Sequence, residues 1–141
     1  MASAFTLSTA SRDAMCNALV DAIDVGGAGK IKIYDGTPPA NPAGSPPNVN
    51  PLAVLVFGAT AFGASSTGAA GNNAIANVTA AVSGTATYFR VTKSDDTVLF
   101  QGSAGASGCD MTLTNSAVIL ANGTISCANG AFTLTVAETQ T

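Results

Sequence analysis

The clearest alternation of hydrophobic and polar positions in the chain lies between Gly84 and Ala104. Over Thr85–Thr92 successive side chains change face, and a period of two with aromatic and β-branched residues is typical of a half-buried strand. Lys93–Asp96 is a polar turn, after which Thr97–Gln101 returns as a second strand. The segment therefore predicts a β-hairpin. The two faces of its first strand are Thr85, Thr87, Phe89 and Val91 on one side, and Ala86, Tyr88, Arg90 and Thr92 on the other.

Hydrophobic residues recur at helical spacing between Thr9 and Asp24 and predict one helix. Ser8 or Thr9 can cap it, because a hydroxyl oxygen accepts a hydrogen bond from the free amides of the first turn. Gly26 and Gly27 end it, as glycine does where the backbone turns left-handed. We expect the hydrophobic stripe to pack against a sheet, with partner binding as the alternative. The stripe contains Met15, Cys16, Leu19, Val20, Ala22 and Ile23.

Shorter patterns predict further strands. Lys30–Tyr34 alternates between faces, whereas Leu52–Phe57 is a short apolar run that predicts a strand buried on both faces. Asn122-Gly123 is a two-residue turn signal, after which Thr124–Cys127 is expected to return beside Ala117–Ala121. Asn129-Gly130 is a second such signal. The remaining predicted strands are Asn73–Val82, Asp110–Thr114, Ala117–Ala121, Thr124–Cys127 and the alternating segment Phe132–Val136.

Taken together, these elements predict a mainly β fold. We expect a β-sandwich or barrel-like domain of eight or nine short strands with one N-terminal helix. A chain of 141 residues has the size of one domain, so residues 1–141 are assigned to a single β-domain. Within it, residues 1–7 form an N-terminal arm, residues 8–25 carry the helix and residues 35–51 form a proline-rich loop.

The loop at residues 35–51, DGTPPANPAGSPPNVNP, contains all six prolines of the chain. Proline fixes its own backbone angle and lacks an amide donor, so the loop is predicted to be irregular or polyproline-like. Connections of this length within one domain often carry interactions. We expect either a rigid arm or a crossover connection across the domain.

Charge is sparse, with 9% charged residues and a net charge of −3, against about 25% charged residues in typical domains. Low charge with many small residues suits a protein whose surface is covered by neighbours; the alternative is a secreted β-domain from an alanine-rich proteome. The basic residues form no cluster, which argues against nucleic-acid binding and against binding to anionic membranes. They are Arg12, Lys30, Lys32, Arg90 and Lys93.

Two further absences in the sequence concern location. No apolar run approaches the roughly 18 residues of a transmembrane helix. Met1–Ala10 contains no sustained apolar core of a secretory signal, so we expect synthesis in the cytoplasm.

The sequence offers little for catalysis. There is no histidine, and the carboxylates are spread over the helix exterior and turns. Cys16 lies on the helix without a histidine to activate it. The glycine-rich segment Gly102–Gly108 has no lysine and precedes no helix, so it is not expected to bind phosphate. Asp95-Asp96 supplies too few oxygen ligands for calcium by itself, and a solvated turn is preferred. We predict no enzymatic activity and no cofactor.

The three cysteines are Cys16, Cys109 and Cys127. An odd number without a close pair favours neither a disulfide framework nor a zinc site. We expect three small, semi-buried thiols. The alternative is a Cys109–Cys127 disulfide across neighbouring strands.

Two segments resemble small structural proteins of tailed bacteriophages. LSTASRDAMCNALVDAIDVGGAGKIKIYDGTPPANP fits the pattern S-T-A-x-R-x-A-x-x-x-A-x-V-D followed by K-I-x-I-Y-D-G-T-x-P. GTATYFRVTKSDDTVLFQGSAGASGCDMTL is similar to G-T-A-T-W-F-R followed by D-G and then by V-x-x-G-x-x-G, with Tyr88 in place of the tryptophan. The resemblance runs from Leu7 to about Val136, and its motifs are structural rather than catalytic. The proline loop is longer than is usual in that group.

The resemblance implies a virion protein that is made in the bacterial host cytoplasm. We expect a head decoration or cement protein on the capsid exterior, bound to the major capsid protein, as a homo-oligomer such as a trimer. The alternatives are a tail or baseplate component and a glycan-binding surface module. The residues expected at the interface are Phe5, Leu7, Pro38, Pro39, Pro42, Pro46 and Pro47.

Overall fold

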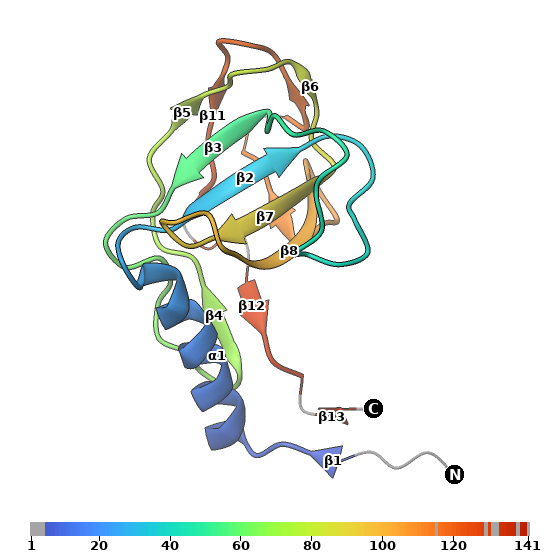
Figure 1. The fold of residues 1–141 in the computed structure, drawn as a ribbon. Coiled ribbons are helices and arrows are strands. Elements are labelled where there is room, and N and C mark those ends of the chain that lie inside the picture. The colour runs from blue at the N-terminus through green and yellow to red at the C-terminus, as the bar shows by residue number, and fades with distance from the viewer. Residues whose placement is uncertain (1–4, 115, 129, 131–132, 138, 141) are drawn as a thin grey trace.

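The computed structural model describes residues 5–114, 116–128, 130, 133–137 and 139–140. Its centre is a five-stranded sheet in the order β3-β2-β7-β8-β9, which curls into a half-barrel (Figure 1). All neighbours in this sheet are antiparallel except β8 and β9, which are parallel. The strands are β2 (Lys30–Tyr34), β3 (Ala53–Val56), β7 (Tyr88–Thr92), β8 (Val98–Gly105) and β9 (Met111–Thr112).

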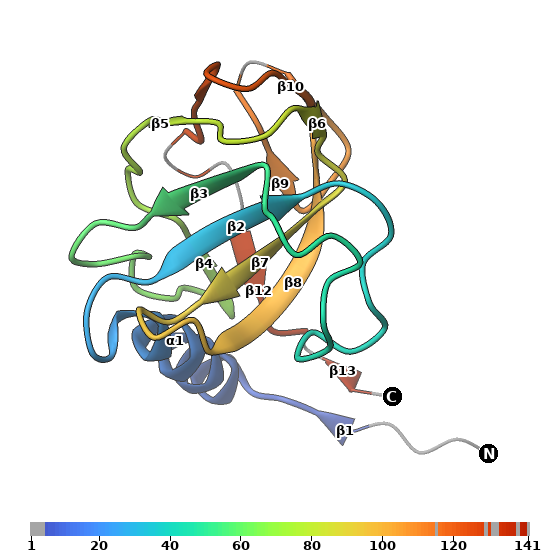
Figure 2. The same cartoon turned by 45° about the horizontal axis from the view of Figure 1, so that its top comes forward.

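Two-stranded pairs surround the central sheet. Three of them carry residues of the hydrophobic core, and the fourth, β1 with β13, lies beside the chain ends at one extremity of the molecule (Figures 1 and 2). The predicted class, a β-rich domain with one N-terminal helix, is confirmed. The strands are more numerous and shorter than predicted. The pairs are β4 (Ala69–Gly71) with β12 (Thr133–Thr135), β5 (Val78–Thr79) with β11 (Thr124–Ile125), β6 (Gly84–Thr85) with β10 (Val118–Ile119), and β1 (Phe5–Thr6) with β13 (Thr139–Gln140).

The helix α1 spans Thr9–Asp24, as predicted. Ser8 is the N-cap, and its hydroxyl oxygen accepts a hydrogen bond from the Ser11 amide at 3.2 Å. The buried positions Cys16, Val20 and Ile23 face the core. Met15 was expected in the same stripe, but its side chain is 50% exposed. One residue along a helix turns the side chain by about 100°, which carries Met15 off the narrow face that the core covers.

The polar face of α1 holds the loop before β4. Asp13 accepts hydrogen bonds from the Gly68 amide at 2.7 Å and the Ser65 hydroxyl at 2.9 Å. Asn17 accepts one from the Ser65 amide at 2.8 Å, and the Arg12 guanidinium donates to the Thr67 carbonyl at 3.0 Å. The helix is therefore fixed by its polar side as well as by its hydrophobic stripe.

The predicted hairpin is present as β7 and β8, and it forms the middle of the core. Cross-strand neighbours place Leu55, Ile31, Val91 and Phe100 in one row on the inner face. The Phe89 ring meets the Phe100 ring edge-on, with centroids 6.4 Å apart. Gly102 lies opposite Phe89, and a β-carbon there would come within 2.8 Å of the ring, so this position accommodates glycine only.

Two strand predictions are corrected by the sheet topology. Leu52–Phe57 was expected to be buried on both faces, but Val56 is 49% exposed because β3 is an edge strand whose outer face is uncovered. Asn122-Gly123 does form a turn, since the Gly123 amide donates to the Leu120 carbonyl at 2.8 Å. The strands that flank this turn pair with β6 and β5 rather than with each other.

The three cysteines are free thiols, as expected, and the alternative of a Cys109–Cys127 disulfide is wrong. Cys16 and Cys127 are buried and Cys109 is half-buried. Asn129 of the second predicted turn and Phe132 of the last strand lie outside the described residues.

The edge position of β3 supports a stability prediction with a built-in control. Leu55 is fully buried and its neighbour Val56 is half-exposed. We expect Leu55→Ala to lower the free energy of unfolding by about 3 kcal/mol, because it removes buried methyl groups and leaves a cavity. Val56→Ala should lower it by less than about 0.5 kcal/mol. Urea denaturation measures both values, and equal losses would contradict the assigned faces of β3.

Candidate functional site

The proline-rich loop, residues 35–51, folds back over the outer face of the central sheet (Figure 2). It leaves β2, crosses β7 and β8, and returns to β3 beside β2. Two side chains of the sheet hold it by its main chain: Arg90 donates to the Gly44 carbonyl and Gln101 to the Pro39 carbonyl, each at 2.6 Å. Of the two predicted forms, a rigid arm or a crossover connection, the structure shows the crossover connection.

Short polar side chains shape the loop locally. The Asn41 side chain accepts a hydrogen bond from the Ala43 amide at 3.0 Å, and the Gly44 amide donates to the Asn41 carbonyl at 2.8 Å. The Asn48 amide group donates to the Asp35 carboxylate at 3.1 Å. Asparagine favours such turns because its side chain replaces a backbone partner. These contacts, with prolines that hold the backbone extended, give an irregular but ordered segment.

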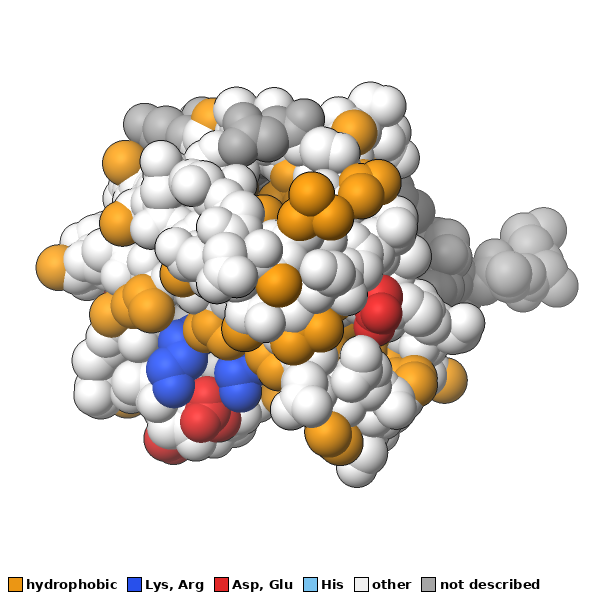
Figure 3. All heavy atoms as spheres, turned by 90° about the horizontal axis from the view of Figure 1, so that it is seen from above, with side chains coloured by type: hydrophobic (Ala, Val, Ile, Leu, Met, Phe, Trp, Pro, Cys, Tyr) orange, Lys and Arg blue, Asp and Glu red, His pale blue; other side chains and the backbone are white. Residues whose placement is uncertain are grey.

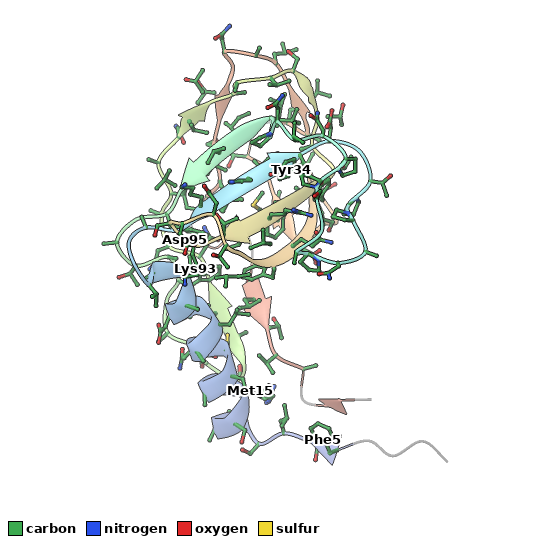
Figure 4. All side chains as sticks on the ribbon, viewed as in Figure 1. Phe5, Met15, Tyr34, Lys93 and Asp95 are labelled. Atoms are coloured by element: carbon green, nitrogen blue, oxygen red, sulfur yellow. The ribbon has the colours of Figure 1, made fainter. Side chains whose placement is uncertain are left out.

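Beneath the loop lies a cluster that we call the Arg90 site, formed by Tyr34, Tyr88, Arg90 and Gln101. The two tyrosine rings stack with centroids 5.2 Å apart and planes inclined by 13°. The Arg90 guanidinium lies 5.9 Å from the centroid of the Tyr34 ring, a cation–π arrangement, and Arg90 is only 4% exposed. Figure 4 shows Tyr34 beside the loop. The sequence segments YDGT and TYFR, which contain Tyr34 and Arg90, thus meet here.

Several polar atoms of the Arg90 site have no hydrogen-bond partner within the described chain. They are the Tyr88 hydroxyl, Arg90 Nε and Gln101 Oε1, and each is buried. Burial raises the pKa of the Tyr88 phenol above its ordinary value of 10.0, so the hydroxyl keeps its proton at neutral pH and remains a donor. The site therefore presents two free donors and one free acceptor.

The residues predicted from sequence as interface candidates do not converge on one surface. Phe5 is 64% exposed and lies beside the chain ends, far from the loop (Figure 4). Leu7 is half-buried. The five candidate prolines of the loop differ in exposure. Pro38 and Pro47 are exposed, whereas Pro39, Pro42 and Pro46 are half-buried.

The predicted turn at Asp95-Asp96 carries an ion-pair cluster. Asp96 accepts from Lys30 at 2.9 Å and from Lys32 at 3.0 Å, and these contacts lower the pKa of its carboxyl. Asp95 accepts a hydrogen bond from the Thr97 amide at 3.0 Å. Asp96 is thus occupied by lysines, which disfavours the calcium alternative. Among the described residues, no group of three or more His, Cys, Asp or Glu side chains is placed to hold a metal ion.

A cavity of about 360 Å³ lies beside β8 on the side of β12. Its single titratable lining residue is Asp110, whose carboxylate accepts two hydrogen bonds from Ser103, from the amide and the hydroxyl, both at 2.8 Å. These bonds lower the pKa of Asp110. Because a general acid–base reaction needs a second titratable group, this lining does not provide a catalytic acid–base pair. The lining residues are Phe89, Phe100, Gln101, Gly102, Asp110, Thr133, Leu134 and Thr135.

Large apolar side chains are exposed at the end of the molecule that carries β6 and β10. Val118 is 61% exposed, Leu120 67% and Val82 36%. The Ala121 amide donates to the Ser83 hydroxyl at 2.8 Å, which brings the two segments together. Figure 3 shows this end, where hydrophobic side chains lie among uncharged atoms and few charges are visible. We call Val82, Val118 and Leu120 the apolar end.

Sequence reasoning missed both the Arg90 site and the apolar end. For the Arg90 site, the alternation that placed Tyr88 and Arg90 on one face of the strand was a usable signal. It did not show that the proline loop covers this face. The apolar end had no signal, because Val118 and Leu120 were assigned to an ordinary short strand.

Comparison of the chain with protein-family models, with curated protein sequences and with solved structures found no match. Among the described residues, no helix has both the length and the apolar character needed to cross a membrane.

The unpaired Tyr88 hydroxyl leads to a prediction about stability. We expect Tyr88→Phe to raise the free energy of unfolding by about 1 kcal/mol, because a buried hydroxyl without a partner loses its hydration on folding. The neighbouring change Thr87→Val should lower it by about 1 kcal/mol, because the Thr87 hydroxyl donates to the Gly36 carbonyl at 2.6 Å. Urea denaturation compares the two, and a destabilised Tyr88→Phe protein would mean that the hydroxyl has a partner.

The Asp110–Ser103 contact predicts a pH dependence. A carboxyl with a lowered folded pKa contributes stability that is fully present above the unfolded pKa of about 3.9 and is lost as pH falls through the folded pKa. Asp110 is exposed, so water screens these bonds. We expect Asp110→Asn to lower the free energy of unfolding by about 0.5 kcal/mol at pH 7, and by less as the solution is acidified below about pH 4. Thermal unfolding across this pH range measures both effects. Asp21→Asn, at an exposed position of α1, is the control and should change neither the stability at pH 7 nor its dependence on pH.

Proposed function

We propose that this chain is a structural protein of a tailed-bacteriophage virion that decorates the capsid exterior and cements the head lattice. The observation that carries the proposal is the exposure of large apolar side chains at two opposite ends of a domain with few charges. A free monomer rarely exposes such patches, and they usually mark surfaces that neighbouring proteins cover.

The two ends differ in construction. At one end, Val82, Val118 and Leu120 form the apolar end. At the other, Phe5 of β1 and Met15 of α1 are 64% and 50% exposed (Figure 4). A subunit with an apolar surface at each end can bridge two neighbours. Repeated over a lattice, modest contacts of this kind become effectively permanent through multivalency.

The bacteriophage resemblance supports the same role from the sequence. Its two segments correspond to α1 with β2 and to β6 through β9, which include most of the central sheet. These segments therefore support the assignment of the fold, whereas the exposed apolar end and Phe5 support the presence of binding partners. We propose the major capsid protein and further copies of this chain as those partners.

A glycan-binding module has less support. Such modules present aromatic rings on their surface, whereas among the described aromatic residues only Phe5 is a largely exposed side chain. Tyr34 and Tyr88 are covered by the proline loop and are 5% and 1% exposed.

The proposal is tested by locating the protein in purified phage particles. We expect hundreds of copies per particle by quantitative mass spectrometry, and cryo-electron microscopy density on the outside of the capsid that fits this fold. Density confined to the tail, with tens of copies or fewer, would replace the decoration role by a tail role. Absence from the particle would contradict both.

A variant pair tests the apolar end within this function. We expect Val118→Ser with Leu120→Ser to abolish retention of the protein on decorated capsids, because two exposed apolar contacts are lost together. Val56→Ser is the matched control, since Val56 is also exposed but belongs to the face of β3. Sedimentation of capsids mixed with each folded variant measures retention. Equal retention of both variants would exclude the apolar end from the interface.

A further inference from the structure

Three of the four buried side-chain atoms without a hydrogen-bond partner in the described chain belong to the Arg90 site. Arg90 is directly opposite Gln101 across β7 and β8, and Tyr88 lies two residues from Arg90 on the same face. The fourth atom, Nε of Arg12, is on α1. Buried polar atoms are nearly always paired in folded proteins. Their concentration at one place indicates a site that receives a group from outside this chain.

The charge of Arg90 leads to the same conclusion. The ion pairs among the described residues join Lys30 and Lys32 to Asp96, and Arg90 takes part in none. Among the described residues, its guanidinium donates to the Gly44 carbonyl and lies over the face of the Tyr34 ring. The Asp35 carboxylate acts on Tyr88 but forms no ion pair with Arg90, and it accepts a hydrogen bond from Asn48. A buried charge is normally matched by an opposite charge, and a carbonyl carries only a partial one. The guanidinium, with Nε–H free, can still bind an anionic oxygen.

The free atoms specify the chemistry of the missing group. The planar guanidinium and the Tyr88 hydroxyl are donors suited to a carboxylate. The acceptor Gln101 Oε1 requires a donor, which a carboxylate lacks and a backbone amide supplies. A peptide segment with an aspartate or glutamate side chain offers both groups.

The proline loop now occupies the place of that peptide. Residues 39–44, with the sequence PANPAG, carry no charged side chain and offer only main-chain carbonyls to Arg90 and Gln101. None of residues 35–51, all of which the structure describes, belongs to the hydrophobic core. Moving this segment therefore takes no side chain out of the hydrophobic core, although it uncovers Tyr34 and Tyr88 and breaks the bonds to Arg90 and Gln101. Local opening of this kind costs less than global unfolding.

We propose that Tyr34, Tyr88, Arg90 and Gln101 form a binding site for an acidic segment of a partner protein, and that the proline loop closes this site when the segment is absent. The carboxylate of the segment binds Arg90 Nε–H and the Tyr88 hydroxyl, and a backbone amide of the segment donates to Gln101 Oε1. This site goes beyond the virion role and does not depend on it.

The test is a titration of the ¹⁵N-labelled full chain, followed by nuclear magnetic resonance, with the capped peptide Gly-Gly-Glu-Gly-Gly at constant ionic strength. We expect a saturable shift of the Arg90 Nε–H signal together with the amide signals of residues 40–45. The peptide Gly-Gly-Gln-Gly-Gly is the control and should produce neither. Failure of the glutamate peptide to saturate the Arg90 signal, or equal shifts with both peptides, would overturn the proposal.

Variants distinguish specific binding at the Arg90 site from nonspecific electrostatic attraction of the peptide. Tyr88→Phe should weaken binding of the glutamate peptide about tenfold, because one hydrogen bond to a charged oxygen is lost. Lys32→Gln removes a neighbouring positive charge on the same face and should weaken it less than twofold. An equal loss of affinity in the two variants would show that the peptide is attracted only by the overall positive charge of this face. Arg90→Lys keeps the charge but loses Nε–H, and should abolish saturable binding; if this variant does not fold, Tyr88→Phe alone decides.

Discussion

The two-sided burial of β7 is the constraint on which the rest of the structure depends. All five residues of this strand, Tyr88–Thr92, are buried, although it lies in a sheet with a single hydrophobic core. Phe89 and Val91 reach their burial by packing against β2, β3 and β8 on the inner face. Tyr88 and Arg90 are covered on the outer face by an irregular loop. A polar and aromatic face can be buried in this way because main-chain carbonyls of the loop satisfy part of its hydrogen bonding.

The irregular segments are held mainly by polar contacts. Asp13 and Asn17 of α1 hold the segment around Ser65, as Arg90 and Gln101 hold the proline loop. In each case a side chain on a regular element binds the main chain of a connection. This arrangement lets a domain with short strands and many small residues keep long connections ordered. It also leaves those connections outside the hydrophobic core, where they can change position without loss of the fold.

In the proposed Arg90 site, the residues that would bind a partner also lower the stability of the isolated chain. Among the described residues, a buried guanidinium without an ion-pair partner and a buried phenol without a hydrogen-bond partner both lower the stability of the isolated chain. Residues that cost stability without a structural return are characteristic of functional sites. The apolar end has the corresponding property in hydrophobic terms, because Val118 and Leu120 are exposed to water in the isolated chain. Both features suit a protein whose surfaces are completed by an assembly.

The sequence by itself determined the local elements. Helical spacing, a capping serine and two glycines defined α1, and strict alternation defined β2 and the β7–β8 hairpin, because these signals act over a few residues. The tertiary structure alone decided which distant strands pair after the Asn122-Gly123 turn, and that β3 lies at an edge. It also decided that the proline loop lies on Tyr34 and Arg90. Each of these outcomes depends on contacts between segments far apart in the chain, which no local pattern of side chains encodes.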